Sequence, residues 1–343
     1  MYLSEVTLKN FRSYEDARFS FDKSLTLITG KNGAGKTNLL EAVYVLLQGT
    51  SFRVGDKDMV RDSAIWWRVD GLIEGEPRQV RYQLDHHPPK QIIEHESMKR
   101  FMHTDRLPIV LFEPSDLQLI HGSPSRRRDT LDLMLNALSH RYRTTLNKYE
   151  RIIQQRNTAL KKHSSNLEDQ LFVWDIQLGE YGTTIIQARQ KLVDDLNELI
   201  GGFYGAIAGN IHDVTISYQT ELGRNPTTSS YVAHLHGKLQ LDRLRGSTSF
   251  GPHRDDIVFT LRGSDAKTSA SRGEIRTLLL ALKMAYGKLL EMTHENKPLI
   301  LLDDVFSELD ETRQQNLLGI ATDHQVIITH TKPISTMSQI VID

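Results

Sequence analysis

The feature that most constrains this chain is a glycine-rich segment between a short apolar run and a helical pattern. Residues 30–37 read GKNGAGKT and match the phosphate-loop pattern G-x-x-x-x-G-K-[ST] at every fixed position. Residues 25–29 are apolar and β-branched, as in a buried strand, and residues 38–47 are apolar enough for a core helix. A strand, a glycine loop and a helix in this order predict an α/β fold with a nucleotide-phosphate site.

The residue types in this loop suit phosphate chemistry. Glycines permit backbone conformations that aim successive N–H groups at phosphate oxygens. Lys36 is expected to reach the β- and γ-phosphates, and the Thr37 hydroxyl to ligate Mg²⁺. The alternative is a glycine turn with a solvated lysine, and the flanking strand and helix argue against it. The predicted nucleotide contacts of the loop are Gly30, Lys31, Asn32, Gly33, Ala34, Gly35, Lys36 and Thr37.

Two acids follow a second predicted strand, the apolar run at residues 299–302. Acids at the carboxyl end of such a strand face the nucleotide crevice of a doubly wound sheet. Asp303 is therefore expected to hold Mg²⁺ through water, and Asp304 to orient and polarise the attacking water. The alternative is a pair of acids that only solvates the end of a strand.

A third element opens a predicted helix at residues 274–292. Ser271 and Glu274 have the spacing of a capping box, in which each side chain satisfies the other residue's backbone N–H. A helix start that contains Ser271 and Gly273 also makes an anion site. Both interpretations remain open from the residues alone.

Composition excludes several classes of protein. The chain has 343 residues, 39% of them hydrophobic, which is enough for one large domain or two modest ones. It has no cysteine, which excludes zinc ribbons, Fe–S clusters, thiol nucleophiles and disulfides. No apolar run approaches the ~18 residues of a membrane span, so we expect a cytoplasmic protein without a membrane partner. The net charge is −1, so DNA binding would need a local patch.

The middle of the chain predicts helices. Ser123 and Pro124 suit an N-cap and a first helical position, and apolar residues then recur in steps of three and four, with Arg156 interrupting them. Residues 161–166 suit a hairpin tip, so we expect an antiparallel helical arm inserted into the α/β domain; an ordinary helical subdomain is the alternative. Gly179 and Gly182 favour a bend in its second helix.

The pattern divides the chain into three segments. Residues 1–122 are predicted as ATPase lobe I with the phosphate loop, 123–245 as the inserted helical arm, and 246–343 as ATPase lobe II. Further strands are expected at residues 66–73, 80–84, 107–112, 257–261 and 326–329.

These motifs together resemble those of the ATP-binding-cassette (ABC) ATPases and, within them, the RecF family. The resemblance covers nearly the whole chain. It rests on LKNFRSY at residues 8–14, the phosphate loop, GSPSRRR at 122–128, GPHRDD at 251–256, residues 271–276 and LLDDVFSELD at 301–310. It implies an α/β ABC-ATPase head, with a phosphate loop and a mixed sheet flanked by helices, and an inserted α-helical arm domain.

The resemblance also implies an ATP- and Mg²⁺-dependent homodimer with slow, switch-like hydrolysis. ATP bound at Lys36 of one chain would be capped by Ser271 and Gly273 of the other. His330 stands at the position where such ATPases commonly have a phosphate-sensing histidine. The resemblance further implies Glu274 near the γ-phosphate and Asp310 near the dimer seam, both as nucleotide-binding residues. It also implies Gln118 as the metal-side glutamine and Arg12 in contact with ATP or DNA. Two positions depart from the family pattern, because Arg272 and Glu274 stand where glutamines are usual.

Partners and process follow from the same resemblance. RecF-like proteins bind double-stranded and gapped DNA, act with RecR and RecO, and help to load RecA in recombinational repair, replication and the SOS response. For this chain these are expectations.

Basic residues suggest where DNA could bind. Arg126, Arg127 and Arg128 oppose the macrodipole of the helix they begin, where acids would be favourable. A phosphate-backbone contact would explain them, and a solvated face or pairing with Asp129 and Asp132 is the alternative. Further positive charge near the nucleotide lobe comes from Lys9, Arg12, Arg53, Lys57 and Arg61.

Other classes fit less well. The energising subunit of a membrane transporter would have a short segment between phosphate loop and signature. An SMC-like tether would need far longer arms, since ~30 residues span only about 45 Å. A small-molecule phosphotransferase has no use for the element at residues 271–274.

Overall fold

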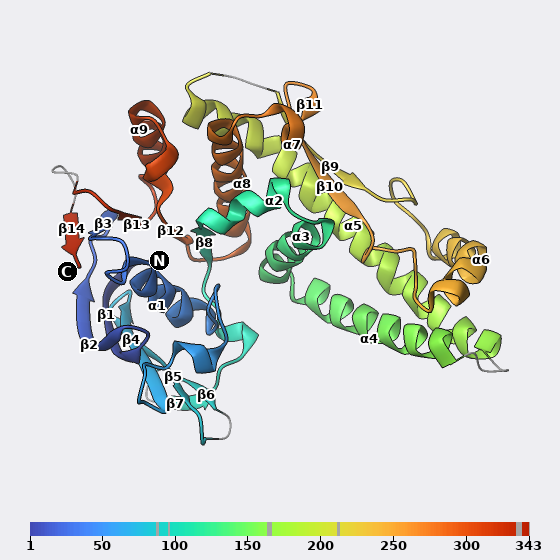
Figure 1. The fold of residues 1–343 in the computed structure, drawn as a ribbon, viewed down its shortest axis with the longest axis horizontal. Helices are drawn as coiled ribbons and strands as arrows, with labels where there is room; N and C mark the ends of the chain where they lie inside the picture. The colour runs from blue at the N-terminus through green and yellow to red at the C-terminus, as the bar shows by residue number, and fades with distance from the viewer. Residues whose placement is uncertain (87–88, 95–96, 163–166, 211–212, 334–337, 343) are drawn as a thin grey trace. The chain divides into compact units, whose positions relative to one another are not determined.

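The computed structural model describes residues 1–86, 89–94, 97–162, 167–210, 213–333 and 338–342 (Figure 1). The chain forms two compact units. The first comprises Met1–Pro114, Ala206–Gly209 and Leu290–Asp343, and the second Ser115–Gly205 and Asn210–Leu289. The second unit thus holds the predicted helical segment and also residues 246–289, which the sequence analysis assigns to lobe II.

The first unit contains two sheets. Sheet A is antiparallel, with strand order β2-β1-β4-β5-β6-β7. Sheet B is parallel, with order β14-β3-β13-β12-β8. The strands of sheet A are β1 (Leu3–Phe11), β2 (Tyr14–Ser20), β4 (Trp66–Ile73), β5 (Glu76–Gln83), β6 (Lys90–Glu94) and β7 (Ser97–Arg100). Those of sheet B are β3 (Leu25–Thr29), β8 (Ile109–Phe112), β12 (Leu299–Leu302), β13 (Val326–His330) and β14 (Ser338–Val341). The expected mixed sheet is therefore two sheets of different kinds.

Helix α1 (Lys36–Gln48) joins the two sheets into one core. It contacts β1, β4 and β5 of sheet A and β13 of sheet B. Its buried residues include Leu39, Leu40, Val43 and Leu46, which belong to an apolar cluster with residues of both sheets. The remaining elements of this unit are the 3-10 helices η1 (Asp56–Met59), η2 (His103–Asp105) and η4 (Val305–Glu308), and α9 (Glu311–Ile320). The predicted strand–loop–helix order around the phosphate loop is confirmed.

The second unit is mainly helical. Its helices are α2 (Gln118–His121), α3 (Pro124–Leu138), α4 (His140–Lys162), α5 (Leu167–Ala208), α6 (Thr228–Arg245), α7 (Ala266–Ser269) and α8 (Arg272–Thr293), where the ends of α5 and α8 belong to the first unit; the 3-10 turn η3 (Pro114–Leu117) precedes them. A small antiparallel sheet has the order β11-β10-β9, with β9 (Val214–Gln219), β10 (Asp256–Leu261) and β11 (Ser264–Asp265). Ser123 is the N-cap of α3 and Pro124 its first residue, as predicted. Residues 163–166 of the expected hairpin tip lie outside the described residues.

The glycines of α5 serve packing rather than a break in the helix. Helix α5 is assigned as one continuous element through Gly179 and Gly182. A Cβ on Gly182 would lie 2.4 Å from the Tyr231 ring of α6, and one on Gly179 would lie 3.0 Å from Thr228 and Val232. The two glycines thus allow a close approach of α5 and α6, and the expected bend stays a prediction.

Arg156 interrupts the apolar pattern of α4 because it lies at the centre of a buried ion cluster. Its side chain is fully buried; Nε donates to Asp175 Oδ1 at 2.8 Å, and Nη1 donates to Asp242 Oδ2 at 2.7 Å and to Thr248 Oγ1 at 2.9 Å. These bonds connect α4, α5 and α6, with the loop that follows α6. The interruption is therefore a structural contact between three helices.

A second buried arginine holds the GPHRDD segment. Arg189 of α5 donates to both carboxylate oxygens of Asp132 at 2.8 Å and to the Pro252 carbonyl at 2.7 Å. His253 of the same segment hydrogen-bonds the Tyr149 hydroxyl at 2.7 Å. A Cβ on Gly251 would lie 2.3 Å from the Tyr231 hydroxyl oxygen, so only glycine fits there. This segment, one of those on which the resemblance rests, is thus a structural junction of the helical unit.

No helix in the described part of the chain is long and apolar enough to cross a membrane.

Candidate nucleotide-binding site

The phosphate loop leads from β3 directly into α1. Gly30 and Gly35 adopt φ of +156° and +109°, and Gly35 is the N-cap of α1. A Cβ on Gly30 would lie 2.2 Å from the Ile342 carbonyl oxygen, and one on Gly35 would lie 2.9 Å from the Tyr14 hydroxyl. The loop therefore requires glycine for its conformation and for close packing, and the N–H groups that begin α1 have no intrahelical acceptors.

Lys36 lies folded over this loop. Its Nζ donates to the Gly30 carbonyl at 2.7 Å and to the Lys31 carbonyl at 2.8 Å. Both acceptors belong to the loop, so the ammonium group is held where the phosphates of a nucleotide would lie. The donor set fits a triphosphate, since it combines a flexible cation with free N–H groups at a helix N-terminus.

The Thr37 hydroxyl and the first acid of the Asp303–Asp304 pair lie together. Thr37 Oγ1 lies 3.1 Å from each carboxylate oxygen of Asp303. Burial raises the pKa of Asp303 above its ordinary value, and the hydroxyls of Thr329 and Thr37 oppose that shift. A hydroxyl and a carboxylate at this spacing are oxygen ligands of the kind that Mg²⁺ takes in nucleotide sites. The residues present therefore fit the ion.

Thr329 connects the two acids and was not singled out from the sequence. Its hydroxyl donates to Asp303 Oδ1 at 2.7 Å and accepts from the backbone N–H of Asp304 at 2.9 Å. Asp304 adopts φ +48°, in the left-handed region. The parallel pairing of β12 with β13 places the ends of both strands side by side. The sequence signal that points to Thr329 is its hydroxyl at the end of the apolar run at residues 326–329.

His330 ends β13, next to Thr329. Its ring packs edge-on against Phe306, with centroids 5.8 Å apart. Burial lowers the pKa of His330, an effect that Asp304 opposes. Its Nδ1 is buried and has no hydrogen-bond partner in the described part of the chain. The neutral imidazole of His330 thus lies at this edge of sheet B, with a buried ring nitrogen that pairs with none of the described residues.

Arg12 is bound to α1 rather than extended into solvent. It forms a two-pronged pair with Glu41, at 2.8 and 2.9 Å, and donates to the Asp58 carbonyl at 3.1 Å. Glu41 is fully buried and also accepts from the Ser51 hydroxyl, while Arg53 lies 4.0 Å from it. The sequence analysis missed Glu41, which is the acidic centre of this cluster.

The turn between β1 and β2 packs against the phosphate loop. The Tyr14 hydroxyl donates to the Gly35 carbonyl at 3.2 Å, and Asn38 Nδ2 donates to the Ser13 hydroxyl at 3.0 Å. Burial raises the pKa of Tyr14 to about 12, so it stays protonated and keeps donating at neutral pH. The segment at residues 8–14, singled out by resemblance, therefore supports the nucleotide loop.

The start of α8 forms the capping box. The Ser271 N–H donates to Glu274 Oε2 at 2.8 Å, and the Glu274 N–H donates to Ser271 Oγ at 3.3 Å. Arg262 pairs with the other oxygen of Glu274 at 2.6 Å. The carboxylate is thus held back by its cap and by a cation, and the Ser271 N–H lowers its pKa. Ser271 and Arg272 are exposed, and the neighbouring Gly273 is partly exposed.

The other implied site residues lie elsewhere on the chain. Asp310 is the N-cap of α9, where its carboxylate accepts from the Arg313 N–H at 2.9 Å. Gln118 begins α2 in the second unit and is exposed. The place of Asp310 near a dimer seam and the role of Gln118 as a metal ligand remain predictions.

The arginine triplet at the start of α3 is largely engaged within its own unit. Arg127 is buried and forms a two-pronged pair with Asp256 at 2.6 and 2.8 Å. Arg128 is half-buried and donates to the Asp255 carbonyl at 2.8 Å. Arg126 is exposed and donates to Ser115. Neither Asp129 nor Asp132 is the partner of Arg127.

The basic residues after α1 are more accessible. Arg53 and Lys57 are exposed, and Arg61 is half-buried and pairs with Glu15 at 3.0 Å.

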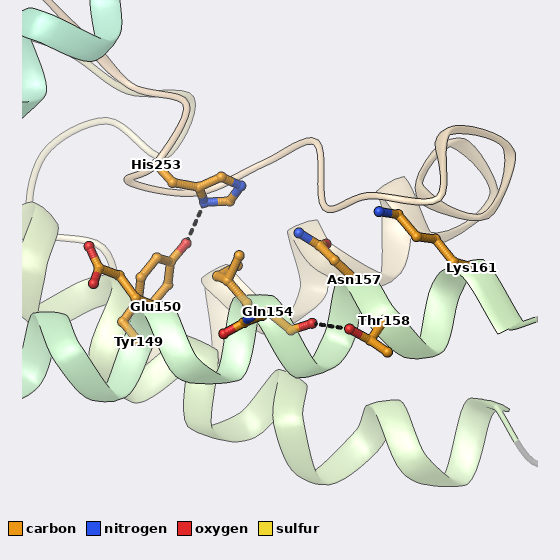
Figure 2. A pocket seen from close by; sticks show the side chains of 8 residues that line it. Tyr149, Glu150, Gln154, Asn157, Thr158, Lys161 and His253 are labelled. Atoms are coloured by element: carbon orange, nitrogen blue, oxygen red, sulfur yellow. Dashed lines mark hydrogen bonds between the residues drawn. The ribbon is translucent and has the colours of Figure 1, made fainter.

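A polar groove of about 440 Å³ follows α4 beneath His253 (Figure 2). Its lining includes Gln154, Asn157 and Lys161, and Figure 2 shows these side chains along one face of the helix.

Comparison with known proteins identifies the family. A family model described as an AAA ATPase domain matches residues 1–215. A DNA replication and repair protein RecF of Bacillus cytotoxicus is 33% identical over 330 residues, covering 93% of this chain and 88% of the relative. One of Streptococcus suis is 34% identical over 339 residues, covering 96% and 93%. The chain belongs to the RecF family.

Solved structures agree with this assignment. A structure of the recombination mediator protein RecF-ATPrS in the RecFOR pathway has a TM-score of 0.87 and 30% identity, covering 100% of this chain and 97% of that chain. An SMC head bound to the C-terminal winged-helix domain of ScpA has a TM-score of 0.56 at 14% identity and shares the fold alone. The expected ABC-ATPase head is confirmed, and this RecF-family chain is an ATP-binding ATPase of DNA repair, replication and recombination.

Proposed function

We propose that this RecF-family protein is an ATP-driven homodimeric switch on duplex and gapped DNA that acts with RecO and RecR and helps to load RecA. The observation that carries the proposal is the division of the nucleotide machinery. The phosphate loop and acidic pair belong to the first unit, and the exposed start of α8 belongs to the second. By resemblance, Ser271 and Gly273 of one protomer complete the site of another.

In this proposal the phosphate loop binds ATP. Lys36 exchanges its bonds to the loop carbonyls for phosphate oxygens, and the N–H groups that begin α1 contribute the positive end of the helix. Thr37 and Asp303 are the residues that would hold Mg²⁺, which neutralises charge on the phosphates when bound. Glu41 keeps Arg12 close to α1, so Arg12 reaches nucleotide only by leaving that pair.

Hydrolysis is proposed to depend on Asp304 and His330. Thr329 holds the backbone of Asp304 at the end of β12, from which the carboxylate would orient and polarise water. By resemblance His330, at the end of β13, is the phosphate-sensing residue. Aspartate is one methylene shorter than the glutamate usual in cassette ATPases, which favours slow, switch-like turnover that is coupled to the dimer and to DNA.

Asp304→Asn tests the hydrolytic role cleanly. Asparagine tolerates the left-handed backbone at this position, so the variant removes charge without strain. ATP binding should be kept while phosphate release falls at least about 100-fold, within the range for general base catalysis. An unchanged hydrolysis rate would exclude Asp304 as the base.

Duplex-DNA affinity, measured by fluorescence anisotropy with Mg·ATP and then Mg·ADP, tests the switch. Ser271→Arg places a bulky cation at the exposed helix start, whereas Ser269→Arg changes an equally exposed serine on α7 and serves as the matched control. We expect tighter binding with ATP, lost in Ser271→Arg and kept in Ser269→Arg. Equal affinity with both nucleotides would refute a switch that acts through DNA binding.

A further inference from the structure

One surface of the first unit carries a row of cations that the nucleotide site does not use. In sheet A, Lys9 of β1 lies opposite Arg68 of β4, and Arg68 lies opposite Arg81 of β5. The row continues through Gln91 of β6 to Arg100 of β7. With about 4.8 Å between strands, these four cations, the cation row, extend over about 19 Å.

The cation row lies on the face of sheet A that points away from α1. Along β4, Trp67, Val69 and Ile73 are buried while Arg68 and Asp70 are only partly buried, and β5 alternates in the same way. Because side chains alternate between the two faces, all four cations share the outer face. Arg100 is exposed, and Lys9, Arg68 and Arg81 are partly exposed.

Internal pairing neutralises only half of the cation row. Lys9 lies 3.3 Å from Asp16, and Arg68 lies 2.9 Å from Asp70. Arg81 donates to Gln91 at 2.8 Å and to the Met98 sulfur at 2.9 Å, both uncharged. Within the described ranges, neither Arg81 nor Arg100 has an acidic partner.

Folding stability does not account for this arrangement. Like charges directly opposite each other on neighbouring strands are destabilising, and Lys9–Arg68 and Arg68–Arg81 are two such pairs in succession. The whole chain has a net charge of −1, so the row is a local concentration of positive charge. A polyanionic partner would compensate the repulsion.

We propose that the cation row of sheet A is a binding surface for the phosphate backbone of duplex DNA. Lys9, Arg68 and Arg81 lie one strand apart, and Arg100 lies two strands beyond Arg81, across the buried Gln91. Cations in one line across a sheet suit a row of phosphates, and 19 Å is about the axial length of five or six base pairs. One aromatic residue, the partly buried Trp66 of β4, lies beside Arg68 on this face, and the other neighbours of Arg68 and Arg81 are Asp70, Gln79, Gln83 and Gln91. Surfaces for single strands stack successive bases on a series of aromatic side chains, which a single ring does not supply. We therefore expect this surface to contact the DNA backbone without recognising a base sequence.

This inference rests on the proposed function, because it supplies the DNA surface of the same switch. The test is the salt dependence of duplex affinity with Mg·ATP for the wild type and for the double variant Arg81→Gln/Arg100→Gln. Glutamine keeps a polar side chain at both positions. The matched control is Arg224→Gln, which removes one exposed cation from the second unit.

The double variant should bind duplex DNA more weakly, and the slope of log affinity against log salt should fall by about two. Its ATP affinity and unfolding midpoint should match those of the wild type, which separates loss of a DNA contact from damage to the fold. Arg224→Gln should leave the slope unchanged.

Three other outcomes are distinguishable. If the wild type binds duplex with ATP and the double variant keeps its affinity and slope, the cation row is not the DNA surface, and the proposed function stands. If the variant loses binding only to single-stranded oligonucleotides, the duplex assignment is wrong. If the wild type shows no ATP-dependent duplex binding at all, the proposed function itself fails.

Discussion

The two units of this molecule place charge differently. In the first unit the core around α1 is apolar apart from Glu41 and its partner Arg12, and the charges of the phosphate loop and the acidic pair lie at strand ends and loop edges. In the second unit Arg156 and Arg189 lie inside the protein with carboxylate partners from other helices. The first unit thus uses charge for chemistry at its edge, and the second uses charge to hold helices together.

This difference decides which residues tolerate change. Lys36 and Thr37 contact groups that bind ligand, so their loss should remove activity and leave the fold. Arg156 pairs with Asp175 and Asp242, and all three side chains are buried, so its loss should leave two buried carboxylates without their arginine.

The largest effect is expected from Arg156→Met. Removing one partner of a buried ion cluster costs about 3–5 kcal/mol of unfolding free energy, because the remaining charges stay desolvated. Arg151→Met, at an exposed position of the same helix, should cost less than about 0.5 kcal/mol. Urea denaturation of both variants measures the difference, and equal costs would contradict a structural role for the buried cluster.

Lys36→Ala should show the opposite pattern. Losing a cation that binds phosphate is expected to weaken ATP binding by about 3 kcal/mol, or ~100-fold, while the unfolding free energy changes by less than about 1 kcal/mol. Isothermal titration with ATP and a parallel melting curve test both parts. Lys23→Ala, an exposed lysine before β3, is the control and should behave as the wild type.

The burial of His253 makes the stability of the second unit depend on pH. Burial lowers the pKa of His253 to about 4, below its ordinary value of 6.5. As the pH falls from 6.5 towards 4, the unfolded chain takes up a proton that the folded chain cannot, so stability falls in this window, by on the order of 2 kcal/mol.

The matched comparison is His253→Gln, which should lack this loss. Burial raises the pKa of the neighbouring Asp255 to about 6, and that carboxyl titrates in the opposite sense in both proteins. Subtracting the two stability curves between pH 7 and 4 therefore isolates the histidine. Parallel curves would show that its environment does not exclude the charged form.

The smallest effect is expected from Gly182→Ala. The added methyl group would meet the Tyr231 ring at 2.4 Å, and overpacking of this kind costs about 1–3 kcal/mol. Gly202→Ala on the same helix meets nothing within 4 Å and should stabilise by up to about 1 kcal/mol through helix propensity. If both substitutions stabilise the protein, α5 and α6 do not pack as closely as described.

The comparison also explains what could be predicted from sequence. The phosphate loop, the acids after residues 299–302 and the N-cap at Ser123 depend on short-range order, and the structure has each of them in the predicted element. Arg127 and Arg156 were ambiguous because their partners, Asp256 and Asp242, lie 129 and 86 residues away in the chain. Glu41 and Thr329 were missed for the same reason: a helix or strand pattern does not show which distant side chain needs a partner.

The most direct test of the proposed switch mixes two inactive variants. Lys36→Ala lacks the phosphate-binding lysine, and Ser271→Arg blocks the exposed start of α8. If ATP binds between two protomers, neither variant should dimerise with ATP alone, while their mixture should form a heterodimer with one intact site. Sedimentation velocity with Mg·ATP is the measurement, and the predicted result is a dimer peak only in the mixture. A mixture that stays monomeric while the wild type dimerises would contradict the composite site.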